Sequence, residues 1–321
     1  MKCQHDKSEV VLEVKGVKLY KCHFCGLIFA VNSKNCNLSY KNYYQKETGG
    51  RFNFGIEYLV KFFRFLRALK IFFIAPNAKS VLDIGSGRGW MLYFLKKYFK
   101  YQVAAGTQIS ENAYKFSKEK LKLEIYNQDL LELDFGRNFE VITLWHVLEH
   151  IADPEAYIEK ISEMLENNGI LLIEVPNFNS WSRILSKSYW LALDPTHHLT
   201  FFTQDSLKLL LEKYNLKIKQ SSTFSLEYSA FTSVQSLVNL ITGTNGYFFD
   251  WLRKGGFTPT PKSSSLLSDS EENKLLVWGF NIKIIFHTLL FLILFPACFL
   301  INLALYFSNR GEIINIIAKK Q

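Results

Sequence analysis

Residues 81–90 read Val-Leu-Asp-Ile-Gly-Ser-Gly-Arg-Gly-Trp, and this stretch decides the fold class of the 321-residue chain. A short apolar run that carries one acid, Asp83, leads through three glycines into a helical pattern that begins at Met91. The pattern predicts a strand, a tight loop and the start of a helix. Small residues in such a loop let backbone N–H groups come close to a ligand.

The glycine spacing differs from that of a dinucleotide-binding loop. That fingerprint is G-x-G-x-x-G, with an acid about 20 residues later for the ribose. Here Gly89 comes one residue too early, and Trp90 stands where the third glycine is expected. The acid, Asp83, lies directly before the glycines instead of one strand later. A NAD-dependent sugar enzyme is therefore the weaker interpretation of this loop.

Composition limits the class of protein. The chain is 48% hydrophobic and 21% charged, which is enough for one α/β domain with additions. Its net charge of +9 fits a nucleic acid or an anionic membrane, and the 16% aromatic content favours the membrane. The first residues contain no apolar stretch of signal-peptide length, so we expect a cytoplasmic protein.

The N-terminal unit, expected over residues 1–45, carries a cluster of metal-binding residue types. In a reducing compartment such a cluster indicates a metal before a disulfide. A C-x-x-C turn closed by a glycine, together with C-x-H near the start, predicts a structural zinc site. Cys36 is the reserve ligand if His5 does not bind, and the alternative is a metal-free arm. The predicted zinc ligands are Cys3, His5, Cys22 and Cys25.

After the glycine loop, strand and helix patterns alternate as in a doubly wound α/β domain with a mostly parallel seven-stranded sheet. We expect this domain over residues 46–225, with its last strand in 311–321. A basic, aromatic helix at 54–74 is expected to pack on the sheet, although it could instead lie on a membrane. Strands are expected at 81–84, 102–106, 123–126, 139–144, 170–175, 216–224 and 312–319, and helices at 111–121, 154–165, 204–214 and 228–241.

A hydrophobic insertion is expected over residues 226–310, with a loop at 251–273. Its apolar run at 284–307 is long enough to cross a bilayer of about 30 Å. One crossing would separate the last strand from its sheet, so we expect an interfacial element or a re-entrant hairpin with its turn near Pro296. The alternative is a pair of buried helices in a soluble protein.

Four further segments carry a family resemblance. Together with the glycine loop they resemble class I S-adenosylmethionine (SAM) methyltransferases, in the branch that includes the ubiquinone-biosynthesis O-methyltransferases. The segments are Asn-Gln-Asp at 127–129, Trp-His-Val-Leu-Glu-His-Ile-Ala-Asp-Pro at 145–154, Val-Pro-Asn at 175–177 and Asp-Pro-Thr-His-His-Leu-Thr-Phe-Phe-Thr at 194–203.

This resemblance implies a set of SAM contacts. Asp83 would hold the amino group of SAM, Asp129 would face the adenine amino group, and Trp145 would cover the adenine or the sulfonium. The family's acid for the ribose is replaced by Gln108, so either the ribose is bound without charge assistance or Glu111 substitutes. The floor beneath the methionine end of SAM would be formed by Gly85, Ser86, Gly87 and Gly89.

Three histidines are the catalytic candidates. His146 is the first choice for a general base, because an imidazole titrates near neutral pH, and His150 and His198 are the alternates. The alternative is that Glu149 and His150 only brace the turn. The H-x-x-E-H pattern of residues 146–150 also matches a metallopeptidase signature, but that chemistry requires both histidines on one long helix.

The sequence therefore predicts a SAM-dependent methyltransferase, bound to SAM and structural zinc, at the inner face of the membrane. The expected reaction is O-methylation of a lipid, isoprenoid-quinone or lipid-linked glycan acceptor. We expect no nucleic-acid partner, and the oligomeric state is not indicated. The alternative is a catalytically inactive SAM-fold subunit that scaffolds or anchors a biosynthetic complex.

Overall fold

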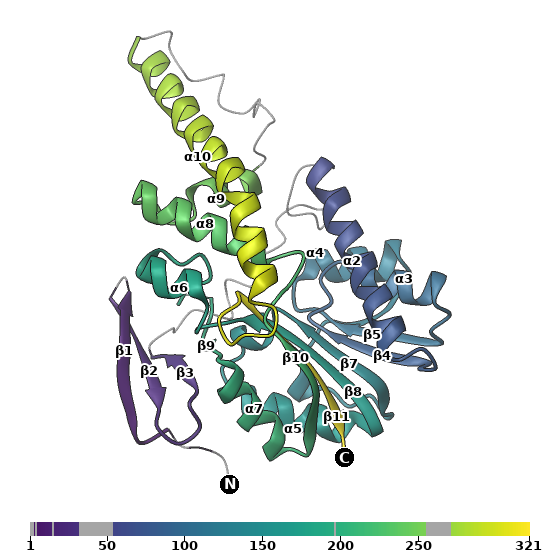
Figure 1. The fold of residues 1–321 in the computed structure, drawn as a ribbon. Helices are drawn as coiled ribbons and strands as arrows, with labels where there is room; N and C mark the ends of the chain where they lie inside the picture. Colours follow the sequence, from purple (N-terminus) through teal and green to yellow (C-terminus); the bar gives the residue numbers. More distant parts are fainter. Residues whose placement is uncertain (1–2, 4, 15, 32–53, 196, 255–270) are drawn as a thin grey trace.

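The computed structural model describes residues 3, 5–14, 16–31, 54–195, 197–254 and 271–321. These residues form a large mixed sheet flanked by helices, a small sheet beside it, and a long helix that extends away from both (Figure 1). The reserve zinc ligand Cys36 and most of the loop expected at 251–273 lie outside the described residues.

The large sheet has seven strands in the order β10-β11-β8-β7-β4-β5-β6. The pairs among β4 to β8 are parallel, and β11 runs antiparallel to both β8 and β10. The expected doubly wound, mostly parallel seven-stranded sheet is therefore confirmed, including the return of the last strand to the sheet. The strands are β4 (Ser80–Ile84), β5 (Val103–Thr107), β6 (Glu124–Tyr126), β7 (Phe139–Trp145), β8 (Leu165–Pro176), β10 (Leu216–Ser222) and β11 (Ile313–Lys320).

One strand begins earlier than the sequence predicts. The Asn-Asn-Gly of residues 167–169 was expected to separate a helix from a strand that starts at Ile170, but β8 already begins at Leu165. Leu165 is fully buried and pairs with Phe139, and the register then shifts before Val141 pairs with Ile170. The turn residues therefore form an irregularity inside the strand, because burial of Leu165 outweighs their local preference for a turn.

Helices cover both faces of the large sheet. On one face, α2 (Phe54–Ile74) and α3 (Trp90–Tyr98) bury Ala68, Ile71 and Leu92 against the strands, so α2 packs on the sheet as expected. The other face is covered by α5 (Pro154–Met164) and α7 (Gln204–Lys213). The helix expected at 111–121 is split into α4 (Glu111–Lys115) and a π-helical turn at Phe116–Lys120.

The N-terminal unit is attached to the large domain through a shared sheet. Its strands β1 (Ser8–Val14), β2 (Val17–Cys22) and β3 (Ile28–Ala30) form an antiparallel sheet that β9 (Thr200–Phe201) extends. Apolar side chains from both parts form one cluster, in which Leu19 and Ile28 pack with Trp190 and Phe201. The position of the unit is therefore fixed by the loop that contains the predicted site residue His198.

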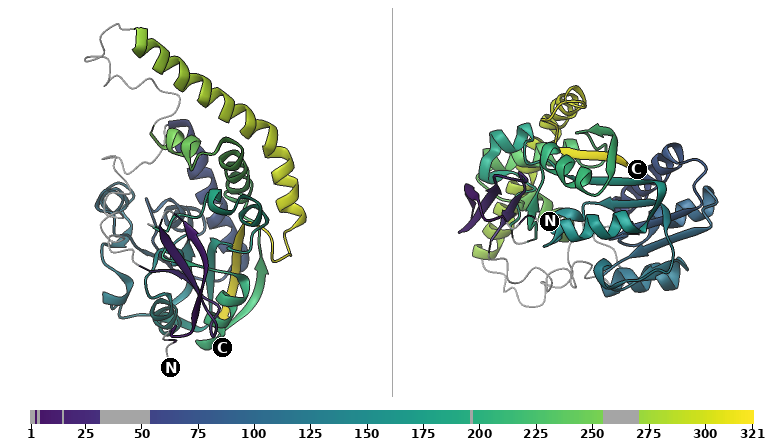
Figure 2. Two further views of the ribbon diagram at one scale, coloured as in Figure 1. Left: turned by 90° about the vertical axis from the view of Figure 1, so that its left-hand side faces the viewer. Right: turned by 90° about the horizontal axis from the view of Figure 1, so that it is seen from below.

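In the described part of the insertion lie the helices α8 (Ser229–Thr242), α9 (Tyr247–Lys254) and α10 (Glu271–Ala304). The expectation of a re-entrant hairpin at Pro296 is wrong, because α10 is one continuous, gently curved helix (Figure 2). A proline removes one hydrogen bond and bends a helix without having to end it. Cys298 of α10 packs against Val234 and Val238 of α8.

Candidate functional site

The glycine loop lies at the carboxyl end of β4, where ligands bind in open α/β sheets. Gly85 has a φ of 70°, and its N–H donates to Thr107 Oγ1 over 3.2 Å. The next N–H, of Ser86, donates to the Thr107 carbonyl over 2.9 Å. A Cβ on Gly85 would lie 2.5 Å from Val147 Cγ2, so this position accepts no larger residue without a shift. The loop is a narrow cradle that is held against β5.

Asp83 precedes this cradle as a buried carboxyl, 4% exposed. It accepts a hydrogen bond from Thr143 Oγ1 of β7 over 2.6 Å. Burial raises the pKa of Asp83 to about 6, against the opposing effect of this hydrogen bond. Asp83 lies at the same edge of the sheet as the cradle. A nearby cation would stabilise the charged form of its carboxyl group.

Gln108 and Asp129 follow β5 and β6, whose carboxyl ends meet the same edge of the sheet. Gln108 Oε1 accepts the Ser110 N–H over 2.8 Å, which leaves its amide group as a donor. Asp129 accepts the Tyr157 hydroxyl over 2.6 Å and the Leu131 N–H over 2.9 Å. Gln108 is thus fixed within its own loop, and Asp129 is fixed by its own loop and by Tyr157 of α5.

The proposed substitute for the ribose acid, Glu111, lies on an exposed part of α4. Its side chain is 54% exposed and pairs with Lys115 of the same helix over 3.2 Å. Gln108 is buried, so it remains the better placed of the two side chains.

Trp145 at the end of β7 is covered by basic side chains of α2. The guanidinium carbon of Arg67 lies 4.5 Å from a ring centroid of Trp145, and Lys70 Nζ lies 5.4 Å from it. Trp145 itself is 8% exposed. One face of the indole is therefore occupied by an arginine, which limits any contact with a ligand to the rest of the ring.

His146 is held between two buried carboxylates. Its Nε2 lies 3.1 Å from Glu174 Oε1 and its Nδ1 lies 3.4 Å from Glu149 Oε1, and its ring contacts that of Tyr228. Burial alone would lower the pKa of His146, but the hydrogen bonds to Glu149 and Glu174 outweigh it and raise this pKa to about 9. A raised pKa favours the protonated imidazole, in which His146 donates hydrogen bonds, and its assignment as general base stays a prediction.

A network of buried and partly buried charges lies at this edge of the sheet. Glu227, just before α8, pairs with Arg64 over 2.7 Å and with Arg67 over 2.8 Å. Arg67 also lies 3.7 Å from Glu174. Burial alone would raise the pKa of Glu174, but His146 and Arg67 outweigh it and hold this pKa at about 2.

Sequence reasoning missed this network. The available signal was the spacing of Arg64, Arg67 and Lys70, which places three bases on one face of a largely apolar helix. A second signal was Glu174, an acid near the end of an apolar strand. Both patterns indicate buried ionic partners.

The alternates His150 and His198 lie together on the other side of Glu149. His150 Nδ1 donates to the carbonyl of His197 over 3.0 Å, and His198 Nδ1 donates to that of Ala192 over 2.8 Å. The ring centroids of His150 and His198 are 4.7 Å apart. Burial lowers the pKa of His150 to about 4, so it is neutral at physiological pH.

The metallopeptidase arrangement is absent from residues 146–150, all of which the structure describes. His146 follows strand β7 directly, whereas Leu148–His150 form a short 3-10 helix. The two histidines also have different partners, so they do not share one face of a long helix.

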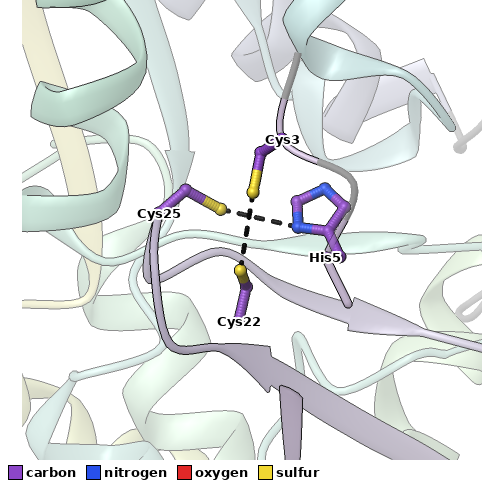
Figure 3. Close-up of side chains that lie close together, drawn as sticks. All are labelled: Cys3, His5, Cys22 and Cys25. Carbon is purple, nitrogen blue, oxygen red and sulfur yellow. Dashed lines mark hydrogen bonds between the residues drawn. The ribbon is translucent and has the colours of Figure 1, made fainter. Parts of the chain in front are cut away.

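The four predicted zinc ligands converge at the base of the small sheet (Figure 3). Cys3 Sγ lies 3.6 Å from Cys22 Sγ, and Cys25 Sγ lies 3.5 Å from His5 Nδ1. All four ligand atoms lie within 4.8 Å of one another. Burial alone would raise the pKa of Cys22, but the backbone N–H groups of Cys25 and Phe24 outweigh it and lower this pKa to about 6.

Comparisons with known proteins agree with this geometry. Residues 58–221 match a family model described as a methyltransferase domain. An ubiquinone biosynthesis O-methyltransferase of Nitrosomonas europaea is 26% identical over 174 residues, which cover 50% of this chain and 72% of that protein. Its counterpart in Dinoroseobacter shibae is 30% identical over 147 residues, which cover 43% of this chain and 59% of that protein.

Among solved structures, a SAM-dependent methyltransferase from Archaeoglobus fulgidus is similar with a TM-score of 0.46 and 20% identity. The similarity covers 80% of this chain and 94% of that chain.

The charge network predicts a large stability difference between two arginines. Arg67→Ala leaves the buried Glu174 and the largely buried Glu227 without their shared cation, so we expect a loss of about 3–5 kcal/mol in the free energy of unfolding. Arg137→Ala is the control, because its pair with Glu124 is on the surface and should contribute about 1 kcal/mol or less. Urea denaturation measures both, and equal losses would contradict a structural role for the network.

Proposed function

This chain belongs to the methyltransferase domain family as a class I SAM-dependent methyltransferase, and from that premise we propose that it methylates an oxygen of a membrane-associated acceptor. The family match and the glycine cradle at the carboxyl end of β4 carry the methyl-transfer part. The relatives named for ubiquinone biosynthesis support an oxygen acceptor on an isoprenoid or lipid-linked molecule.

The residues at the cradle fit SAM, which when bound supplies an electrophilic methyl group on a sulfonium. We propose that Gly85, Ser86, Gly87 and Gly89 provide close backbone approach to its methionine end, and that Asp83 stabilises its amino group. Gln108 can donate its amide N–H to a ribose hydroxyl, because Oε1 is already used by Ser110. Asp129 retains lone pairs for the adenine amino group, and Trp145 presents the ring edge that Arg67 does not cover.

We place the acceptor beside His146, at the carboxyl end of β7 next to Trp145. A cationic imidazole held by Glu149 and Glu174 can donate a hydrogen bond to the acceptor and orient its oxygen. The neutral His150, with His198 beside it, is on the far side of Glu149. These residues would therefore serve the acceptor side of the site, and the loop around Gly85 the cofactor side.

Binding of SAM should depend on the missing side chain at Gly85. We expect Gly85→Ala to weaken SAM binding at least about tenfold, because the added Cβ meets Val147 and the φ of 70° is unfavourable for alanine. Gly136→Ala is the matched control, since Gly136 has a φ of 60° but no atom near an added Cβ. Titration calorimetry measures both variants.

Two results would contradict the SAM assignment. One is wild-type protein that binds NAD in place of SAM. The other is an equal loss of SAM affinity in both glycine variants, because it would show that the cradle is not the site. Thermal melting checks that each variant is folded.

The membrane part of the proposal is supported by the side chains of α10. Residues Ile282–Ala304 are long and apolar enough to span a bilayer, and only 17% of this stretch is buried. Its two buried polar side chains face the protein: His287 approaches Thr244 Oγ1 over 3.3 Å, and Asn302 Nδ2 donates to Ser233 Oγ over 2.9 Å. A helix with polar contacts inward and an apolar face outward is suited to a lipid environment.

A single crossing of the bilayer does not fit the rest of the chain. Helices α8 and α9 before α10 both contact it, and β11 after it pairs with β8 and β10. The segments on both sides of α10 thus belong to one body. We therefore propose that α10 lies in the interface of the inner leaflet and that the catalytic domain stays in the cytoplasm.

Membrane binding should depend on the exposed face of α10. We expect Leu289→Ser with Leu292→Ser to lower partitioning into vesicles at least about tenfold, because each leucine contributes roughly 1.5–3 kcal/mol when buried. Leu131→Ser with Leu209→Ser is the control, since these leucines are exposed away from α10. Flotation with phosphatidylcholine–phosphatidylglycerol vesicles measures both. The proposal would be contradicted if the wild type does not bind vesicles and instead forms a dimer that the α10 variant, but not the control, dissociates.

We also propose a structural zinc ion at Cys3, His5, Cys22 and Cys25. Two thiolates on one tetrahedral zinc lie about 3.8 Å apart, close to the 3.6 Å between Cys3 Sγ and Cys22 Sγ. The turn that presents Cys22 and Cys25 is closed by Gly26, whose φ is 68° and whose N–H donates to the Cys22 carbonyl. The ion would hold this small sheet against β9.

Removal of one zinc ligand should release the ion. We expect Cys22→Ser to lose one equivalent of zinc per chain and to melt at lower temperature, because the small sheet has little core of its own. Cys298→Ala is the control, since Cys298 is buried beside α8 far along the chain from this cluster. Mass spectrometry of bound metal measures the stoichiometry, and a zinc content that is equal in the two variants would contradict the assignment.

A further inference from the structure

A second group of potential metal ligands lies beside His146. Glu149, His150 and His198 each offer one ligand atom, and the three atoms lie within 4.8 Å of one another. Two ligands of one tetrahedral zinc lie about 3.4 Å apart, given bonds of about 2.1 Å. The ligand atoms are thus within about 1.4 Å of the spacing that coordination requires.

The two imidazoles have the orientation of metal-binding histidines. Each donates its Nδ1–H to a backbone carbonyl, His150 to that of His197 and His198 to that of Ala192. This bond fixes the tautomer with the proton on Nδ1, so the Nε2 atom carries the lone pair. Most metal-ligating histidines are oriented in this way, by an acceptor such as a carbonyl that binds the N–H of the other ring nitrogen.

The carboxylate of Glu149 provides an independent observation. Its Oε1 pairs with His146, but its Oε2 is buried and has no hydrogen-bond partner among the described residues. The whole residue is 2% exposed. An unpartnered buried carboxylate oxygen is unfavourable by several kcal/mol, whereas a bound cation would satisfy it.

The loop that carries His198 is fixed in position by backbone hydrogen bonds. The Leu199 N–H donates to the carbonyl of Glu149 over 2.8 Å, and the Ala30 N–H donates to that of Leu199 over 3.0 Å. The strand after His198, β9, pairs with β3 of the small sheet. The three ligands therefore come from segments that are already joined.

We propose that Glu149, His150 and His198 bind a divalent cation of the zinc class. Two imidazole nitrogens and one carboxylate oxygen are a common ligand set for such ions, and three protein ligands leave a position open for water or a substrate oxygen. A role for this cation in holding the acceptor oxygen rests on the proposed methyl transfer. The binding of the cation itself does not depend on that proposal.

The test uses protein that contains residues 1–321, stripped with a chelator and reloaded with Zn²⁺ or Co²⁺. We expect two ions per chain in the wild type and one in Glu149→Gln and in His198→Gln. Cobalt at the cysteine cluster gives an intense thiolate charge-transfer band, so that band should persist in both variants. His197→Gln is the matched control, because this neighbouring histidine pairs with Asp194 outside the cluster.

The outcomes separate this inference from the other proposals. One ion that Cys22→Ser removes and that Glu149→Gln and His198→Gln both retain would overturn the second site. One ion that remains in Cys22→Ser and disappears in His198→Gln would support it and overturn the zinc cluster. SAM titration of the wild type tests the methyltransferase proposal separately, because failure of the wild type to bind SAM would count against that proposal and not against this site.

Discussion

Burial of carboxylates at the open edge of the large sheet is the constraint on which the rest of the structure depends. Glu174 is buried and Glu227 largely buried at this edge, and both pair with a cation inside the protein. Arg67 of α2 supplies one shared cation and at the same time covers Trp145. Helix α2, strand β8 and the start of the insertion are therefore joined by ion pairs at this edge, and Glu174 also helps to raise the pKa of His146.

The two additions to the domain each contact a different part of this edge. The small sheet pairs with β9 and so positions the loop that carries His198. The insertion begins beside Glu227 and ends at β11, where Asn315 donates to Glu174 over 2.8 Å. In the proposed function, these connections place the acceptor side between the loop that carries His198 and helix α10, which faces lipid.

Much of the fold could be predicted from local pattern, because buried parallel strands and their glycine loop are encoded within a few residues. The return of the last strand to the sheet followed from its apolar alternation. The strand start at Leu165 could not be predicted, since it depends on pairing with Phe139. The inward direction of Arg64 and Arg67 is likewise set by Glu227, which is distant in sequence. The proton on His146 depends on two acids from different elements, so its residue type alone suggested a base.

The central claim is that the chain transfers a methyl group from SAM to a membrane-associated acceptor. The most direct measurement incubates the protein with SAM labelled in the methyl group and a lipid extract of its host's membranes, followed by identification of the labelled product. We expect label in an oxygen-methylated lipid, isoprenoid-quinone or lipid-linked glycan, with Gly85→Ala strongly reduced. Tight SAM binding without labelled product in any lipid fraction would contradict the claim and favour a scaffold subunit.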